Sequence, residues 1–281
     1  MAKAITRKQP LRRKSSKKKK SVVSVKFVVI TFLVIAFTFG IYHYKNAILY
    51  YFSFKSDKVL KEDKVAQARI FQILKAHKEL TFGFDVSQFQ GEINWDKVDS
   101  VEHKFPLQFV FIRATAGNDK KDIRFDENWV AAKKHHFIRG AYHYYRPDEN
   151  SLEQAKNFIK NVKLQKGDFP PVLDIEKLSE SQSTDSLKVG LKRWLEAIDK
   201  LYNVKPIIYT GEKYYNDFLK DDFPEYTFWV ANYNFFVENI KVDWLFWQFT
   251  EKARIEGIEE RVDVNIYNGT PMMLHYLTIP N

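Results

Sequence analysis

The sequence predicts an α/β fold, a modified TIM-like barrel preceded by an N-terminal transmembrane helix. Three observations lead to this prediction. From residue 80 onward, eight short β-rich runs alternate with helical patterns, which favours a parallel sheet. Helical patterns follow only the second to the fifth run, so we expect a helix ring that is incomplete at its C-terminal side. A long apolar run without charge precedes this body.

The N-terminal tail, residues 1–21, carries the basicity of the chain. The formal net charge is +10, and residues 1–20 hold ten basic and no acidic side chains. The remainder has 35 basic and 35 acidic residues, so nucleic acid is not predicted as a partner. We expect the tail to bind anionic lipid headgroups at the cytoplasmic membrane. The chain has no cysteine, which excludes disulfides and Cys-based metal sites.

Residues 22–44 are predicted to form a transmembrane signal anchor. The run from Phe27 to Tyr44 has no Asp, Glu, Lys or Arg, and with the valines upstream it reaches bilayer-spanning length. A cleaved signal peptide is the closest rival, but no clear small-x-small cleavage site follows. The positive-inside rule keeps the tail in the cytoplasm. The expected localisation is a single pass through the cytoplasmic membrane, with the body in the periplasm or at the cell surface.

Residues 45–79 are predicted to be a juxtamembrane helical stalk. Val65, Ile70, Phe71 and Leu74 have helical spacing among many charges. The catalytic domain is expected to cover residues 80–281.

The body contains eight strand candidates and four helix candidates. The strands are expected at residues 81–87, 107–115, 140–145, 171–176, 205–210, 227–232, 244–250 and 261–267, and the helices at 126–136, 151–162, 184–202 and 212–220. An open doubly wound sheet is the structural rival. It would be expected to carry a Gly-rich phosphate loop after the first strand, and the run "DVSQFQGEINW" is not such a loop.

Polar residues gather at the predicted carboxyl ends of the strands, where α/β barrels place their active sites. They include Asp85, Arg113, Tyr142, Asp174, Glu176, Tyr209, Asn232 and Gln248, whereas Asp263 lies near the start of the last strand. Residues i and i+2 of a strand share a face, so Asp174 and Glu176 are expected to point the same way, about 6–7 Å apart at Cα. Two carboxylates this close do not easily both ionise, so one keeps a proton near neutral pH.

A proton-holding carboxyl beside further carboxylates fits glycoside hydrolysis. One carboxyl protonates the leaving oxygen, and its neighbours stabilise an oxocarbenium-like charge. A metal site is the competing use of such acids, because hard cations prefer several oxygen ligands.

The body resembles the glycoside hydrolase family 25 lysozymes, the Chalaropsis-type N-acetylmuramidases, from Thr81 to Gly269. The resemblance is carried by "GFDVSQFQGEINWDKV", "FVFIRATAG", "RFDENWVAAKKHHFIRGAYHYYRP", "PPVLDIE", "KPIIYT", "FWVANYN", "WLFWQFT" and "GIEERVDVNIYNG". It implies a (β/α)5(β)3 barrel that uses neither a metal nor an organic cofactor. It also implies cleavage of the β-1,4 bond between N-acetylmuramic acid and N-acetylglucosamine in peptidoglycan.

The resemblance also implies roles for individual residues. Glu176 matches the catalytic acid, and Asp174 matches its partner, which assists attack by the substrate's 2-acetamido group or stabilises the charged intermediate. Asp85 and Asp263 match two further cleft acids. Tyr142 matches an active-site tyrosine. The expected sugar contacts are Tyr209, Trp229, Asn232 and Gln248.

The resemblance departs at Ala116, where family members commonly carry Glu within Lys-Ala-Thr-Glu-Gly. The change removes a side chain that bears on substrate preference or rate. All four cleft acids are present, so we expect an active enzyme. Two alternatives remain: a non-catalytic glycan-binding module, and a glycosidase for another amino-sugar polymer such as chitin.

Overall fold

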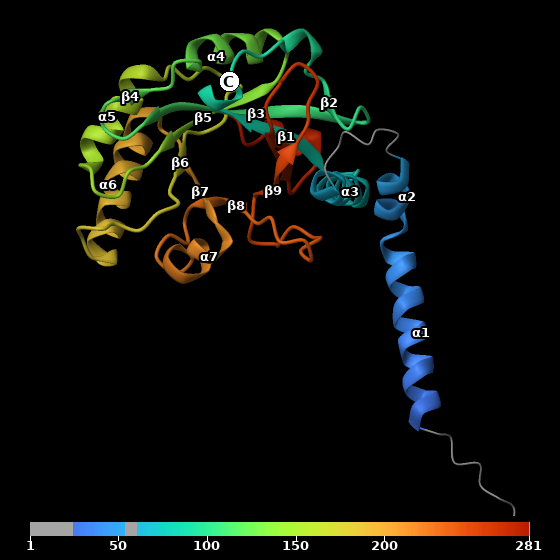
Figure 1. The fold of residues 1–281 in the computed structure, drawn as a ribbon. Helices are drawn as coiled ribbons and strands as arrows, with labels where there is room; N and C mark the ends of the chain where they lie inside the picture. The colour runs from blue at the N-terminus through green and yellow to red at the C-terminus, as the bar shows by residue number, and fades with distance from the viewer. Residues whose placement is uncertain (1–24, 54–60, 281) are drawn as a thin grey trace, which may run out of the picture. The chain divides into compact units, whose positions relative to one another are not determined.

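Eight strands form a closed barrel in the computed structural model, which describes residues 25–53 and 61–280 (Figure 1). They are β1 (Thr81–Val86), β3 (Phe105–Ala116), β5 (Ile138–Tyr144), β6 (Val172–Asp174), β7 (Ile207–Gly211), β8 (Thr227–Ala231), β9 (Phe246–Ala253) and β10 (Val262–Tyr267). The strands pair in the order β1-β10-β9-β8-β7-β6-β5-β3, and β3 pairs with β1 to close the circle. The barrel and its eight strands are therefore confirmed, and the open sheet is excluded.

The last strand corrects the expectation of a purely parallel sheet. β1, β3 and β5 to β9 run parallel to their neighbours. β10 runs antiparallel to both β9 and β1. The short connection at residues 254–261 leaves no room for a helical crossover, which a parallel neighbour would need.

One predicted strand is shorter than expected. β6 covers only Val172–Asp174, although we predicted residues 171–176. Pro170 and Pro171 have no N–H group to donate to the ladder, and Glu176 lies beyond the last paired residue. Two further short strands, β2 (Ser100–Val101) and β4 (Lys120–Lys121), pair with β3 outside the barrel.

The helices lie outside the barrel and follow its second to fifth strands, as predicted (Figure 1). They are α4 (Phe125–Lys134), α5 (Ser151–Asn161), α6 (Thr184–Tyr202) and α7 (Glu212–Tyr214), which continues as a π-helical turn at Tyr215–Leu219. α6 illustrates why these segments are helical. Ser183 caps its first turn by accepting a hydrogen bond from the Ser186 amide, and Leu187, Leu191 and Trp194 face the barrel at helical spacing.

Large aromatic side chains fill the inside of the barrel. Phe109 and Phe111 of β3 pack there with Phe169, Trp229 and Phe246. The ring of Phe111 stacks on Trp229 with centroids 4.4 Å apart. We call these five residues the aromatic plug.

Two glycines make room for the aromatic plug. A Cβ on Gly83 would lie 2.4 Å from the ring of Phe109, and a Cβ on Gly140 would lie 2.4 Å from the ring of Phe111. The close approach of these backbones to the rings therefore requires glycine at both positions. At the lower end of the barrel, Leu274 of the short helix α8 (Pro271–His275) packs against the same cluster.

The N-terminal part of the chain contains the helix α1 (Val25–His43). It is long and apolar enough to cross a membrane, and none of its residues is buried. The basic tail at residues 1–21, and residues 22–24 of the predicted anchor, lie outside the described residues. α1 belongs to a unit that is separate from the compact unit of residues 46–281.

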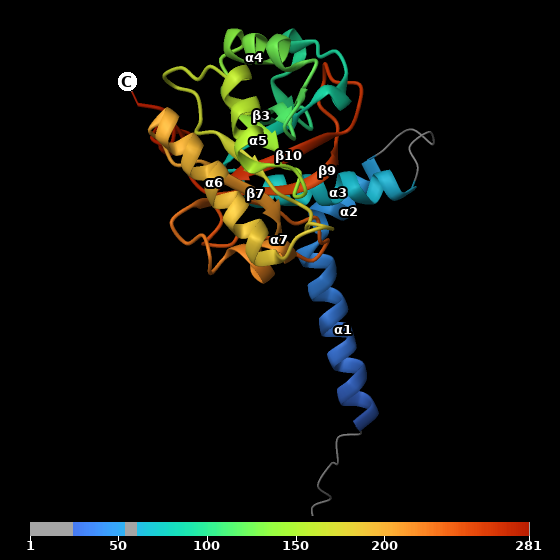
Figure 2. The same cartoon turned by 90° about the vertical axis from the view of Figure 1, so that its left-hand side faces the viewer.

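The predicted stalk is helical where the structure describes it, as α2 (Lys45–Ser53) and α3 (Lys61–Ala76). α3 packs beside β9 (Figure 2). Ile70, Ile73 and Leu74 are buried in the core between barrel and helices, and the Arg69 guanidinium donates to the carbonyl of Phe249 over 2.7 Å. The domain boundary at residue 80 stays a prediction, and this packing favours an earlier one.

Truncation of a buried side chain of α3 should destabilise the whole body. Leu74 is fully buried, so Leu74→Ala should lower the free energy of unfolding by about 2–5 kcal/mol. Urea unfolding of the full-length protein, followed by tryptophan fluorescence, measures this change because all six tryptophans lie between residues 95 and 247. Val65→Ala is the control, since Val65 is 42% exposed on the same helix. Equal, small effects of both changes would show that α3 is not part of the cooperative fold.

Candidate active site

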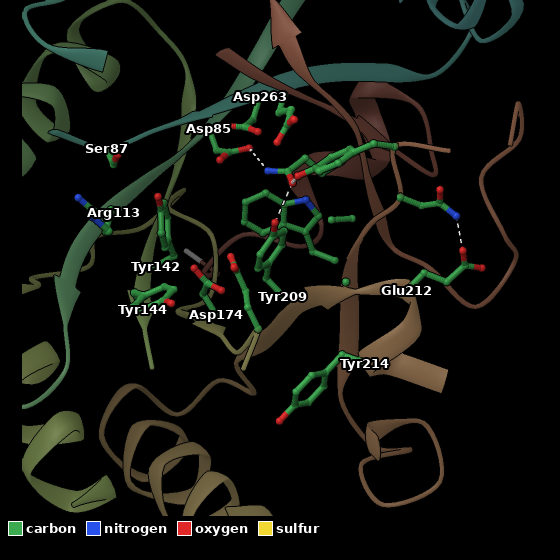
Figure 3. Close-up of a pocket in the computed structure, with 18 of the residues that line it drawn as sticks. Asp85, Ser87, Arg113, Tyr142, Tyr144, Asp174, Tyr209, Glu212, Tyr214 and Asp263 are labelled. Carbon is green, nitrogen blue, oxygen red and sulfur yellow. Dashed lines mark hydrogen bonds between the residues drawn. The ribbon is translucent and has the colours of Figure 1, made fainter. Parts of the chain in front are cut away.

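A cleft of about 950 Å³ opens above the aromatic plug, at the carboxyl ends of the parallel strands (Figure 3). All nine residues predicted for the site line this cleft: Asp85, Tyr142, Asp174, Glu176, Tyr209, Trp229, Asn232, Gln248 and Asp263. The structure thus brings together residues from seven strands and from the segment just after β6. Their roles remain predictions.

Asp174 and Glu176 lie side by side where β6 ends. The amide of Ile175 donates to the carbonyl of Tyr209 over 3.0 Å, which fixes the backbone between the two acids. Asp174 is 4% exposed, and its Oδ1 atom is buried without a hydrogen-bond partner among the described residues. Glu176 is exposed toward the cleft.

Burial and mutual repulsion give this pair a shared proton. Burial first, and then the charge of Glu176, raises the pKa of Asp174 well above its usual range. Withdrawal from bulk water also raises the pKa of Glu176. Two adjacent carboxyls with raised pKa values hold one proton between them near neutral pH.

Asp85 is the acid at the end of β1. Its Oδ2 atom accepts hydrogen bonds from the amide groups of Gln248 and Asn265, each at 2.8 Å. These bonds favour the charged form, but burial outweighs them and raises the pKa of Asp85 to about 7. The carboxyl of Asp85 therefore titrates close to neutral pH.

Asp263 reaches the cleft because β10 is antiparallel. In the register of β1 and β10, Asp263 lies directly opposite Asp85. The start of an antiparallel strand meets the carboxyl ends of its parallel neighbours, which explains why this acid stands at the beginning of its strand. Burial, followed by the charge of Asp85, raises the pKa of Asp263 to about 9.

The predicted aromatic contacts form the floor and wall of the cleft. Trp229 is only 2% exposed, and its indole N–H donates to Oδ1 of Asn265 over 2.8 Å. The Tyr209 hydroxyl donates to Oε1 of Gln248 over 2.7 Å. Burial raises the pKa of Tyr142 and keeps its hydroxyl neutral. Trp229, Tyr209 and Gln248 are thus almost fully buried. Their main role in the structure is to hold the residues that position the acids.

Asn232 lies at the end of β8 and donates a hydrogen bond to Glu212. Glu212 follows β7 and also pairs with Lys241. These two contacts fix one wall of the cleft, and Figure 3 shows the position of Glu212 in that wall.

Three residues that line the cleft and one buried residue, Asn265, were given no role in the predicted site, although Arg113 was noted at a strand end. Asn265 holds both Asp85 and Trp229, and the Tyr233 hydroxyl donates to Gln248. Glu212 binds Asn232, and Arg113 donates through Nε to Asp122 over 2.9 Å. The signal that identified the other residues, a polar side chain at or just after a strand end, also marks Glu212, Tyr233 and Arg113. Asn265 lies inside its strand, and no sequence signal marks it.

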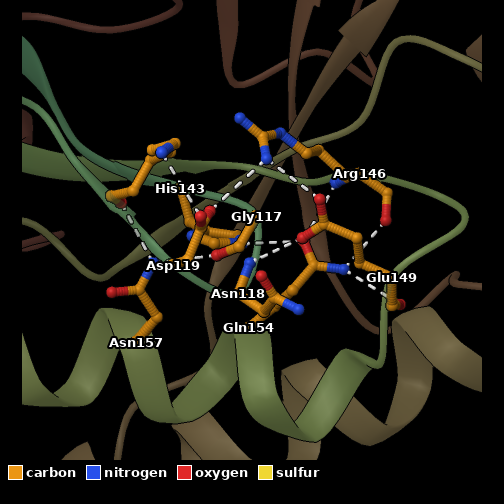
Figure 4. A network of polar contacts seen from close by, with 9 residues as sticks. Gly117, Asn118, Asp119, His143, Arg146, Glu149, Gln154 and Asn157 are labelled. Carbon is orange, nitrogen blue, oxygen red and sulfur yellow. Dashed lines mark hydrogen bonds and ion pairs between the residues drawn. The ribbon is translucent and has the colours of Figure 1, made fainter.

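Ala116 ends β3 and is not among the residues that line the cleft. The turn after it is anchored from outside (Figure 4). The side chain of Asn157 donates to the carbonyl of Gly117 over 2.9 Å, and Glu149 accepts from the amide of Asn118 over 2.7 Å. These contacts hold the turn in place with alanine at position 116.

The rival metal site gains no geometric support. In the described ranges, 25–53 and 61–280, no group of three or more His, Asp or Glu side chains comes together in a way that could hold a metal ion.

A barrel with paired carboxyls in a cleft at this end has the architecture of a glycoside hydrolase. Residues 84–258 match the family described as glycosyl hydrolases family 25. Over 190 residues, 67% of this chain and 70% of its relative, the chain is 38% identical to YegX of Escherichia coli (strain K12). It is 31% identical to Lysozyme M1 of Streptomyces globisporus over 207 residues, 68% of this chain and 69% of the other.

A solved structure agrees with these similarities. The family 25 glycosyl hydrolase from Bacillus anthracis superposes with a TM-score of 0.64 at 28% identity, covering 72% of this chain and 95% of that one. The chain belongs to glycosyl hydrolases family 25. It is therefore a glycoside hydrolase, as the sequence predicted.

Replacement of Asp263 should change how stability depends on pH. A carboxyl with a raised pKa binds its proton more tightly in the folded protein than in the unfolded chain, so its contribution to stability is lost as pH rises from about 4 to about 9. Asp263→Asn removes this loss. Relative to wild type, its free energy of unfolding should be higher at pH 8 than at pH 5 by more than about 1 kcal/mol, the equivalent of one pKa unit.

Urea unfolding at both pH values measures this difference. Glu196→Gln on the exposed face of α6 is the matched control, and it should show no pH-dependent difference from wild type. An Asp263→Asn protein that loses stability toward pH 8 relative to wild type would contradict the raised pKa.

Proposed function

We propose that the protein is a peptidoglycan hydrolase, a lysozyme that cleaves the β-1,4 bond between N-acetylmuramic acid and N-acetylglucosamine. The observation that carries this proposal is the pair of Asp174 and Glu176 at the end of β6, in a barrel of family 25. Relatives named lysozyme and N,O-diacetylmuramidase support the choice of substrate.

Glu176 is proposed as the general acid. Its carboxyl faces the open cleft, where it can protonate the leaving glycosidic oxygen. Asp174 lies beneath it, shielded from water. The proton that the pair shares must lie on Glu176 when the bond is cleaved, because only Glu176 faces the leaving oxygen of a sugar bound in the cleft. Asp174 is then ionised and stabilises the positive charge that develops on the sugar.

Asp85 and Asp263 are proposed to set the electrostatic potential around Asp174 and Glu176. Both carboxyls lie near Glu176, whose charge contributes to the raised pKa of each. Tyr142 and Asn232 are proposed as sugar contacts because they line the cleft next to the acids. Tyr209, Trp229 and Gln248 are proposed to bind substrate mainly through the floor that they build beneath it.

Replacement of the proposed acid should abolish cleavage. Glu176→Gln keeps the shape of the side chain but removes the transferable proton, so release of reducing ends from purified peptidoglycan should fall by roughly 100- to 10,000-fold. Glu180→Gln, an exposed change outside the cleft, should retain the wild-type rate. Unchanged thermal unfolding of both variants shows that the fold is intact. A Glu176→Gln protein with full activity would refute this assignment.

The products separate the proposed reaction from its rivals. Mass spectrometry of products from defined peptidoglycan should find muramic acid at the new reducing ends. Glucosamine at those ends would identify a glucosaminidase. The departure at Ala116 leaves open one further candidate, a glycosidase for another amino-sugar polymer, and cleavage of chitin in place of peptidoglycan would support it. Binding without cleavage would indicate a non-catalytic glycan-binding module.

We further propose that α1 anchors the enzyme in the cytoplasmic membrane, with the catalytic body outside. Support comes from the length and apolar composition of α1 and from the basic residues before it, which favour a cytoplasmic N-terminus. This orientation places the cleft on the side of the membrane where peptidoglycan lies.

The proposed topology can be tested on cells that express the full chain with a C-terminal tag. The protein should stay in the membrane fraction after alkaline extraction, and protease added to spheroplasts should remove the tag. A variant with Val34→Arg and Ile35→Arg in the middle of α1 should be retained less well, because each charge costs about 2.5–3.5 kcal/mol at the centre of a span. Release of the unaltered protein by alkali, or protection of the tag, would contradict the anchor or its orientation.

A further inference from the structure

Phe89 presents an aromatic ring to water at the point where two hollows meet. Its side chain is 69% exposed. Phe89 and Gln90 line both the catalytic cleft and a second groove of about 910 Å³, which residues 91–97 and 257–260 help to form. A polymer that leaves the cleft on this side therefore passes over Phe89.

The backbone that carries Phe89 is fixed without help from its ring. Phe89 lies in the short 3-10 helix η1 (Gln88–Gln90), where Ser87 and Gln90 form a capping box. The Gln88 amide donates to Asp122 over 2.9 Å, and the Gln90 side chain donates to the carbonyl of Arg261 over 3.2 Å. The exposed ring contributes little to the fold.

Arg113 fixes the orientation of the ring. Its guanidinium lies 4.7 Å from the ring centroid of Phe89, and its Nε donates to the buried carboxylate of Asp122 over 2.9 Å. Asp122 thus accepts hydrogen bonds both from η1 and from Arg113, which supports the ring of Phe89. The ring therefore packs on Arg113, yet its side chain stays largely exposed at the border of the cleft and the second groove.

We propose that Phe89, supported by Arg113, is a binding platform for a sugar of the glycan strand beyond the two sugars that flank the cleaved bond. A rigid, exposed aromatic face offers a large apolar contact surface with little loss of side-chain freedom. Such a surface matches the apolar face of a pyranose ring. The inference rests on the proposed function, because it takes the amino-sugar glycan as the ligand.

The platform should matter more for long strands than for short ones. Phe89→Ala should lower kcat/KM for a peptidoglycan-derived octasaccharide about tenfold more than for the tetrasaccharide, the loss expected from one aromatic contact. Phe89→Trp should restore the octasaccharide rate. Tyr276→Ala is the matched control, since Tyr276 is 83% exposed next to α8 at the other end of the barrel. Equal losses for both lengths, or no loss for either, would overturn the platform.

A binding measurement separates this inference from the proposed reaction. In the full-length Glu176→Gln protein, calorimetric titration with the octasaccharide should show binding about tenfold weaker when Phe89→Ala is added. If wild type binds the octasaccharide without cleaving it and Phe89→Ala weakens that binding, the platform stands and the proposed reaction fails. If Phe89→Ala leaves octasaccharide binding unchanged while wild type cleaves it, the reaction stands and the platform fails.

Discussion

The candidate site depends on one physical constraint, the layer of carboxyl groups that lies directly on the aromatic plug. Phe109, Phe111 and Trp229 exclude water from below, and the carboxyls of Asp85 and Asp174 lie above them at the same end of the barrel. Burial is the largest cause of the raised pKa of each acid. The plug therefore provides the low-dielectric surroundings that let a carboxyl keep a proton near neutral pH.

Neutral side chains organise this acidic layer. The side-chain oxygen of Gln248 accepts hydrogen bonds from the hydroxyls of Tyr209 and Tyr233. Its side-chain nitrogen donates a hydrogen bond to Asp85. Asn265 accepts from Trp229 and also donates to Asp85. The two amide side chains orient Asp85, and Asn265 connects it to Trp229 of the plug. Because the amides are neutral, they add no positive charge that would lower the pKa values of the other carboxyls. Gln248 and Asn265 thus contribute both to the packing beneath the cleft and to the pKa of Asp85, which their hydrogen bonds lower.

Most of the fold and the site could be predicted from sequence because they depend on local patterns. The runs around Asp85, Tyr142 and Asp174 show apolar strands that end in polar residues, and this pattern correctly placed them in one cleft. The antiparallel direction of β10 agrees with the short connection at residues 254–261, but its pairing with β1 joins distant parts of the domain, and no local pattern encodes that pairing. Likewise, Asn265 looks like an ordinary polar residue inside a strand, and its role appears only when Asp85 and Trp229 are brought next to it. The packing of α3 on β9 depends on tertiary contacts in the same way.

The antiparallel course of β10 also bears on biosynthesis. Asp85 is among the first residues of the barrel to leave the ribosome, but its partner Asn265 and the opposing Asp263 belong to the last strand. A nascent chain that stops before β10 has an open barrel without the acid and the amide that this strand supplies. The cleft with its paired acids therefore assembles only after β10 has been synthesised. A chain that ends before β10 would lack Asp263 and Asn265 and would carry no assembled cleft.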